Sequence, residues 1–120
     1  MVTELTKGVY RVGVVDWAIR KFHGQELSTH RGSSYNAYLI MDEETVLVDT
    51  VWGPFQDQLI ENIREVVDPA KIDIVGANHA DVDHSGSLPA VMRHAPHATV
   101  VVSQRGRESV EGHFHQPWTF

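Results

Sequence analysis

A run of four potential metal ligands lies in the second half of this sequence. His79, Asp81, Asp83 and His84 fall within six residues and directly follow an apolar segment, residues 72–77, that reads as a buried strand. Polar residues at the end of a strand are where α/β proteins place their chemistry. Two imidazoles and two carboxylates suit a transition metal such as iron, manganese or zinc. Four donors at this spacing favour a metal site over solvated turn residues.

The spacing of these residues indicates which of them would act together. In an extended or tightly turned loop, alternate side chains point the same way, so His79, Asp81 and Asp83 would project to one side and Val82 would turn toward the protein. Four ligands so close together serve two ions more naturally than one. His79 and Asp81 would then bind one ion, and Asp83 and His84 the other. Each ion would still need ligands from elsewhere.

Strand and helix patterns alternate around this motif. Strands are expected at residues 8–15, 35–41, 45–49, 72–77 and 98–103, and helices at residues 54–67, 86–93 and 104–112. Residues 42–44 predict a hairpin turn, and Ser85 would cap the helix over 86–93. Antiparallel strands followed by β-α-β-α units predict an α/β (α+β) fold that matches the amino-terminal half of an αβ/βα sandwich.

Composition narrows the class of protein. A chain of 120 residues with 42% apolar residues allows one globular domain with a modest core. The net charge of −6 disfavours nucleic acid as a partner. We expect no membrane association, because no apolar run reaches spanning length and the first residues lack a signal-peptide pattern. The absence of cysteine excludes disulfides and cysteine-ligated iron, and is consistent with a cytoplasmic location.

The His-x-Asp-x-Asp-His pattern after a buried strand resembles the metal-binding turn of the metallo-β-lactamase superfamily. At the place of Asp81, the zinc hydrolases of that superfamily usually have His, whereas the flavodiiron proteins have a carboxylate, normally Glu. The chain therefore resembles a flavodiiron protein (A-type flavoprotein). Residues 15–24, 32–39, 48–50 and 108–118 are also similar to the amino-terminal segment of that family. The resemblance covers essentially all 120 residues, but only the first part of a full-length member.

The resemblance implies a partial metallo-β-lactamase-like domain over residues 1–120. It implies an oxidoreductase in which dinuclear iron reduces oxygen or nitric oxide with electrons from FMN. In that picture His79 and Asp81 hold one iron, and Asp83 and His84 hold the other. His23 falls where the family has a catalytic His close to the metals. The FMN-binding flavodoxin-like domain and the remaining ligands, a His, a bridging Asp and a last His, lie beyond residue 120 in the family.

Several expectations follow from this resemblance. Asp81 is one methylene shorter than Glu, about 1.5 Å of reach, so the loop or the ion must shift. Asp49, at the end of a strand, is implied to orient neighbouring groups and not to bind metal. FMN would not bind to this chain alone, so electrons would come from a flavin domain or an electron-donor protein. Half a sandwich would expose one face of a sheet, which predicts a homo-oligomer or a complementing chain.

Two other functions are compatible with the residues. A zinc-dependent hydrolase of the metallo-β-lactamase fold would use Asp81 in place of a zinc-binding His, and Asp83 would orient the attacking water. A non-catalytic fragment would keep the fold, bind metal weakly and turn over no substrate. Metal content after purification separates these alternatives from the flavodiiron hypothesis.

Overall fold

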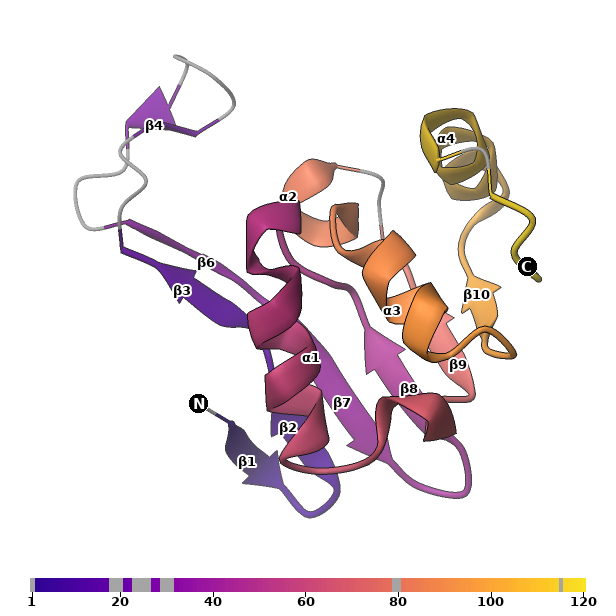
Figure 1. The fold of residues 1–120 in the computed structure, drawn as a ribbon. Coiled ribbons are helices and arrows are strands. Elements are labelled where there is room, and N and C mark those ends of the chain that lie inside the picture. Colours follow the sequence, from indigo (N-terminus) through magenta and orange to yellow (C-terminus); the bar gives the residue numbers. More distant parts are fainter. Residues whose placement is uncertain (1, 18–20, 23–26, 29–31, 79–80, 115) are drawn as a thin grey trace.

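The fold is built on one mixed sheet with helices laid across it (Figure 1). The computed structural model describes residues 2–17, 21–22, 27–28, 32–78, 81–114 and 116–120. Its strands are β1 (Thr3–Thr6), β2 (Val9–Arg11), β3 (Val14–Asp16), β4 (Lys21–Phe22), β5 (Leu27–Ser28), β6 (Ser33–Tyr35), β7 (Tyr38–Met41), β8 (Thr45–Val48), β9 (Ile74–Gly76) and β10 (Thr99–Val101). Its helices are η1 (Gly53–Phe55), α1 (Gln56–Arg64), η2 (Pro69–Lys71), α2 (Val82–Ser85), α3 (Leu88–His94) and α4 (Gln104–Phe114).

The main sheet has the strand order β1-β2-β7-β8-β9-β10. Strands β1, β2, β7 and β8 pair antiparallel, and β8, β9 and β10 pair parallel. Short hairpins join β1 to β2 and β7 to β8, residues 12–37 with the strands β3 to β6 join β2 to β7, and crossovers that carry α1 and α3 join the parallel strands. Met41 pairs with Thr45, which confirms the hairpin turn predicted at residues 42–44. The α/β architecture predicted from the sequence is therefore confirmed.

One face of the sheet is covered over strands β7, β8, β9 and β10. Leu39, Leu47, Val75 and Val100 are cross-strand neighbours in one row, and each has no exposed surface. Helices α1 and α3 lie across this face (Figure 1) and contribute the buried residues Leu59, Ile63, Leu88 and Val91. Each such side chain stabilises the fold by roughly 1.5–3 kcal/mol through burial of apolar surface.

The opposite face carries apolar side chains that the described residues cover only in part. Ile40, Val46 and Ile74 form a neighbouring row and are all half-buried, and Val101 at the edge is 52% exposed. Because side chains alternate between faces along a strand, this row belongs to the side away from α1 and α3. In the described part of the chain, no helix is long and apolar enough to cross a membrane.

The strand predicted over residues 8–15 is two strands, and that prediction was wrong. Strand β2 lies in the main sheet, while β3 pairs with β6 in a separate ribbon. The break falls at Val12 and Gly13, whose amides both donate to the carbonyl of Ala37. A Cβ on Gly13 would lie 2.1 Å from the carbonyl oxygen of Tyr35, so only glycine allows this close crossing. The buried side chain of Asn62, on α1, donates to the carbonyl of Val12 and fixes the break.

The helices mostly follow the sequence pattern. Pro54 lies in the first helical turn, as predicted, and Leu59 and Ile63 are buried on the expected stripe. Regular α-helix ends at Arg64, three residues before the predicted end. The helix expected at residues 104–112 is observed as α4.

The helix predicted over residues 86–93 is observed as α3, beginning two residues later, but the prediction that Ser85 caps it was wrong. Ser85 is buried inside α2, and Ser87 occupies the N-cap of α3. The hydroxyl of Ser87 donates to the carbonyl of Trp52 at 3.4 Å and makes no cap bond. The sequence pattern could not show this because the ligand motif itself turns into helix before α3 begins.

Candidate metal centre

The described part of the ligand motif is a short helix at the carboxyl end of β9. Asp81 stands before α2, and its carbonyl accepts hydrogen bonds from the amides of His84 and Ser85 at 2.9 Å. The expected alternation of an extended loop is therefore wrong for this part of the motif. Val82, which was expected to face the protein, is 50% exposed. His79 and His23 lie outside the described residues.

Asp83 and His84 are two neighbouring potential metal ligands on α2. The Asp83 Oδ2 atom lies 3.3 Å from His84 Nε2, and the side chains are 14% and 23% exposed. Two ligand atoms bound to one ion at about 2.0–2.2 Å, at angles between octahedral and tetrahedral, lie roughly 3.0–3.5 Å apart. The observed 3.3 Å separation lies within this range. Asp81, by contrast, is exposed at the start of the helix.

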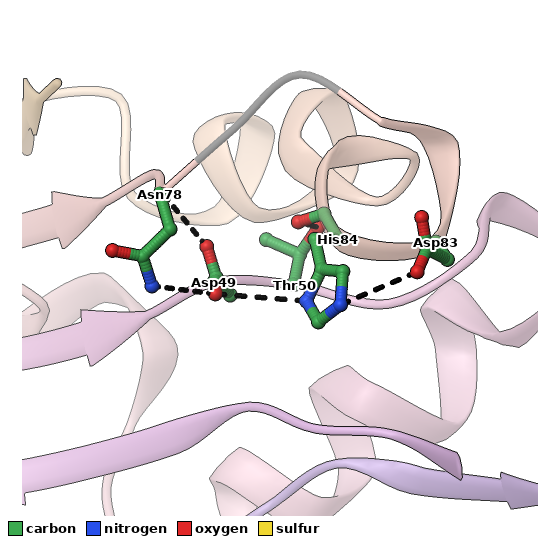
Figure 2. Close-up of polar contacts among 5 residues, drawn as sticks. All are labelled: Asp49, Thr50, Asn78, Asp83 and His84. Atoms are coloured by element: carbon green, nitrogen blue, oxygen red, sulfur yellow. Dashed lines mark hydrogen bonds and ion pairs between the residues drawn. The ribbon is translucent and has the colours of Figure 1, made fainter. Parts of the chain in front are cut away.

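Thr50 binds the backbone of His84. The Thr50 amide and the Thr50 hydroxyl both donate to the carbonyl oxygen of His84 at 2.9 Å. Thr50 is 1% exposed, so these bonds form in the protein interior. They tie α2 to the end of β8, which lies next to β9 in the sheet (Figures 1 and 2).

Close backbone packing supports the same connection. A Cβ on Gly86 would lie 2.5 Å from the carbonyl oxygen of Val82 and 2.7 Å from the amide nitrogen of Gly53. Both distances are shorter than any side chain tolerates, so glycine is required where α2 packs against the segment after Thr50. This packing places α2 directly against the segment after Thr50.

The imidazole of His84 lies between two carboxylates (Figure 2). Its Nε2 faces Asp83, and its Nδ1 lies 3.6 Å from Asp49 Oδ2. Asp49 is 7% exposed and has a φ of 62°, in the left-handed region that residues with a side chain seldom adopt. Asp49 thus lies beside His84, and its role as an orienting group stays a prediction.

Asn78, the last described residue before the motif, binds Asp49 through two hydrogen bonds. Its backbone amide donates to Oδ1 and its side-chain amide donates to Oδ2, both at 2.8 Å. Sequence reasoning did not single out Asn78 or Thr50. Both are polar residues at the carboxyl ends of neighbouring parallel strands, which is the signal that points to a binding edge in such sheets.

A second buried acid lies near the motif. The Tyr35 hydroxyl donates to Asp16 Oδ2 at 2.8 Å, and the two residues are 1% and 4% exposed. Burial raises the pKa of Tyr35 above its ordinary value of 10.0, and the hydrogen bond to Asp16 and the charges of Asp16 and Asp83 raise this pKa further. The Tyr35 ring packs edge-on against Trp52, with 6.2 Å between centroids. Tyr35 is thus within electrostatic reach of the Asp83 carboxylate.

The described part of the chain does not supply a complete set of metal ligands. Among these residues no group of three or more His, Cys, Asp or Glu side chains converges to hold an ion. The Asp83 and His84 atoms fit two neighbouring ligand positions on one transition-metal ion, because imidazole and carboxylate both suit such ions. The geometry therefore supports part of a metal centre whose other ligands must come from elsewhere.

Comparison with known proteins places this chain in a family. Residues 30–120 match the family model described as the metallo-beta-lactamase superfamily. The chain belongs to this superfamily. Over 110 residues it is 49% identical to a protein of Moorella thermoacetica named nitric oxide reductase, covering 92% of this chain and 28% of that protein.

Solved structures of flavodiiron proteins are similar to the superfamily domain described here. Rubredoxin oxygen:oxidoreductase from the anaerobe Desulfovibrio gigas superposes with a TM-score of 0.93 and 38% identity, covering 97% of this chain and 29% of that one. The flavodiiron protein from Giardia intestinalis superposes with a TM-score of 0.92 and 36% identity, covering 99% and 29%. The chain thus spans less than a third of the length of these relatives, and it matches the amino-terminal part of a flavodiiron protein, as its sequence resemblance indicated.

Proposed function

We propose that this chain forms the amino-terminal part of the metal-binding domain of a flavodiiron oxidoreductase. Asp83 and His84 hold one iron, and His79 and Asp81 contribute to the other. The observation that carries the proposal is the 3.3 Å separation of Asp83 Oδ2 and His84 Nε2 on a helix anchored to the end of β8. Similarity to a nitric oxide reductase and to an oxygen-reducing oxidoreductase supports the reaction class.

The chain's own residues hold and orient the ligands in this proposal. Iron, when bound, would supply redox chemistry toward oxygen or nitric oxide, with FMN in the complete protein as the source of electrons. Thr50 fixes the backbone of His84. Asp49, opposite Nδ1, favours the tautomer with the proton on that nitrogen, which leaves Nε2 to bind the ion. The carboxylate of Asp83 brings negative charge that stabilises the oxidised metal.

The partners follow from the same proposal. Oxygen or nitric oxide is the substrate, and a flavin domain or a donor protein delivers electrons. His23 is proposed to donate a hydrogen bond near the metals.

Self-association or a complementing chain remains a prediction, supported by the half-buried apolar row of Ile40, Val46 and Ile74 on the open face of the sheet. Sedimentation of the 120-residue chain measures it, and a stable monomer contradicts it.

The proposal is tested on the full-length protein purified without oxygen. We expect a pair of iron ions and FMN in each chain, and consumption of oxygen or nitric oxide when a reductant is supplied. His84→Ala should lower the iron content, whereas His97→Ala, at an exposed site after α3, should leave it unchanged. Stoichiometric zinc with esterase activity and no iron would establish the hydrolase instead. Absence of metal and of turnover would establish a non-catalytic piece.

A further inference from the structure

The strained residue in the described backbone lies beside the proposed metal centre. Asp49, with its φ of 62°, leaves strand β8 in the left-handed conformation, which residues with a side chain seldom adopt. Such a conformation persists only where surrounding contacts fix it. Here the Asp49 amide donates to the carbonyl of Gly76 at 2.8 Å, and both carboxylate oxygens accept hydrogen bonds from Asn78. Strands β8 and β9 are thus joined just beyond their last ladder pair.

The two bonds from Asn78 fix the orientation of the Asp49 carboxylate. One donor on each oxygen, both at 2.8 Å, sets the plane of the group as well as its position. The oxygen bound by the Asn78 side chain, Oδ2, is also the oxygen that lies 3.6 Å from His84 Nδ1 (Figure 2). The side chain of Asn78 therefore controls the atom that faces the imidazole.

We propose that Asn78 is a positioning residue of the metal centre: its side-chain amide keeps Asp49 Oδ2 opposite His84 Nδ1, so that His84 presents Nε2 to the ion beside Asp83. This inference rests on the proposed function. It assigns a role to a residue that lies outside the four-ligand motif and that binds no metal itself.

The chemistry at this position requires both donors of an asparagine. Aspartate would keep the shape and the backbone donor but would set a second carboxylate oxygen 2.8 Å from Oδ2, with repulsion in place of a bond. Alanine would leave Oδ2 free to rotate away from the imidazole. Glutamine keeps the amide on a longer chain, and restores the bond only if the chain folds back. Loss of the carboxylate beside a metal-binding histidine lowers metal affinity by about 10–100-fold, and Asn78 acts through such a carboxylate.

The test is a titration of the metal-free full-length protein with cobalt(II), followed by its visible absorption, for the parent and for Asn78→Ala. We expect cobalt affinity to fall about 10–100-fold in the variant. Asn36→Ala, at an exposed asparagine between β6 and β7, is the matched control and should bind as the parent does. If Asn78→Ala does not fold, Asn78→Asp and Asn78→Gln replace it, and Asn78→Asp should bind more weakly than Asn78→Gln.

A second measurement distinguishes a positioning role of Asn78 from a general effect of this residue on the stability of the loop. Nitrogen-15 NMR of His84 in the zinc-loaded protein reports which ring nitrogen carries the proton. We expect a single tautomer with the proton on Nδ1 in the parent, and a mixed or reversed signal in the Asn78 variant. If the parent binds cobalt and the folded variant binds equally well with an unchanged tautomer, the role of Asn78 is overturned alone. If the parent binds no cobalt, the proposed function is overturned together with it.

Discussion

Two buried aspartates near the proposed metal centre use the same chemical group in different ways. Asp16, the last residue of β3, accepts a hydrogen bond from the Tyr35 hydroxyl. Asp49, just after β8, accepts both donors of Asn78 and faces the imidazole of His84. Both are less than 10% exposed. The difference teaches that burial alone does not identify an aspartate that supports a metal centre. The groups next to the carboxylate oxygens of each aspartate decide its role.

The largest effect should come from Asp49→Ala. The substitution removes both bonds to Asn78 and places alanine at a left-handed φ, so we expect a loss of about 2–4 kcal/mol in the free energy of unfolding. Cobalt affinity of the full-length protein should fall with it. Urea unfolding measures the first and titration the second. Asp42→Ala, at the exposed hairpin turn, is the control and should change stability by less than about 0.5 kcal/mol.

Tyr35→Phe should sharpen the comparison because it removes only the hydroxyl that binds Asp16. We expect a loss of about 1–3 kcal/mol, since Asp16 then stays buried without this donor. Cobalt affinity should stay within about threefold of the parent, corresponding to well under 1.4 kcal/mol. A fall in affinity as large as that of Asp49→Ala would show that both aspartates serve the metal centre and would remove the distinction.

The pH dependence of stability gives a test of the Tyr35 environment. The folded protein holds the pKa of Tyr35 above its ordinary value of 10.0, chiefly through burial. The folded state therefore binds more protons than the unfolded state above pH 10, and stability must fall as pH rises through that range. Urea unfolding between pH 9 and pH 11 should show this decline, and Tyr35→Phe should make it shallower. An equally steep decline in Tyr35→Phe, with Tyr38→Phe as the control, would contradict this assignment.

The smallest effect should come from Thr50→Val. The backbone amide of Thr50 still donates to the His84 carbonyl, so only the hydroxyl bond is lost. We expect about 0.5–1.5 kcal/mol of destabilisation by urea unfolding and a modest decrease in cobalt affinity. Thr3→Val, on an exposed edge strand, provides the same substitution away from the centre. A gain in affinity would mean that the Thr50 contact restrains α2 away from its metal-binding position.

Local patterns predicted much of the fold from the sequence. The hairpin at residues 42–44, the helix that begins near Pro54 and the strand before the ligand motif all follow from residue types close together in the chain. The break at Val12 and Gly13 is bound by a distant partner, Asn62, and α2 packs against another distant residue, Gly53. No local periodicity reports such contacts.

The sequence indicated the residue types of the site and one neighbouring acid, Asp49, but not the hydrogen-bond partners Asn78 and Thr50. His79, Asp81, Asp83 and His84 were singled out by spacing, and their binding of metal remains a prediction. The supporting bonds join Asn78 to Asp49 across 29 positions and Thr50 to His84 across 34. The parallel pairing of β8 with β9 brings these segments together, but no local pattern shows which side chains bind each other across such a separation.

The central claim is that Asp83 and His84 bind the same redox-active ion. Crystals of the full-length protein grown without oxygen allow anomalous diffraction to be measured on both sides of the iron absorption edge. We predict an iron peak within bonding distance of both Asp83 Oδ2 and His84 Nε2, with Asp49 Oδ2 opposite Nδ1. A map with iron elsewhere in the protein and none beside these two atoms would contradict the account.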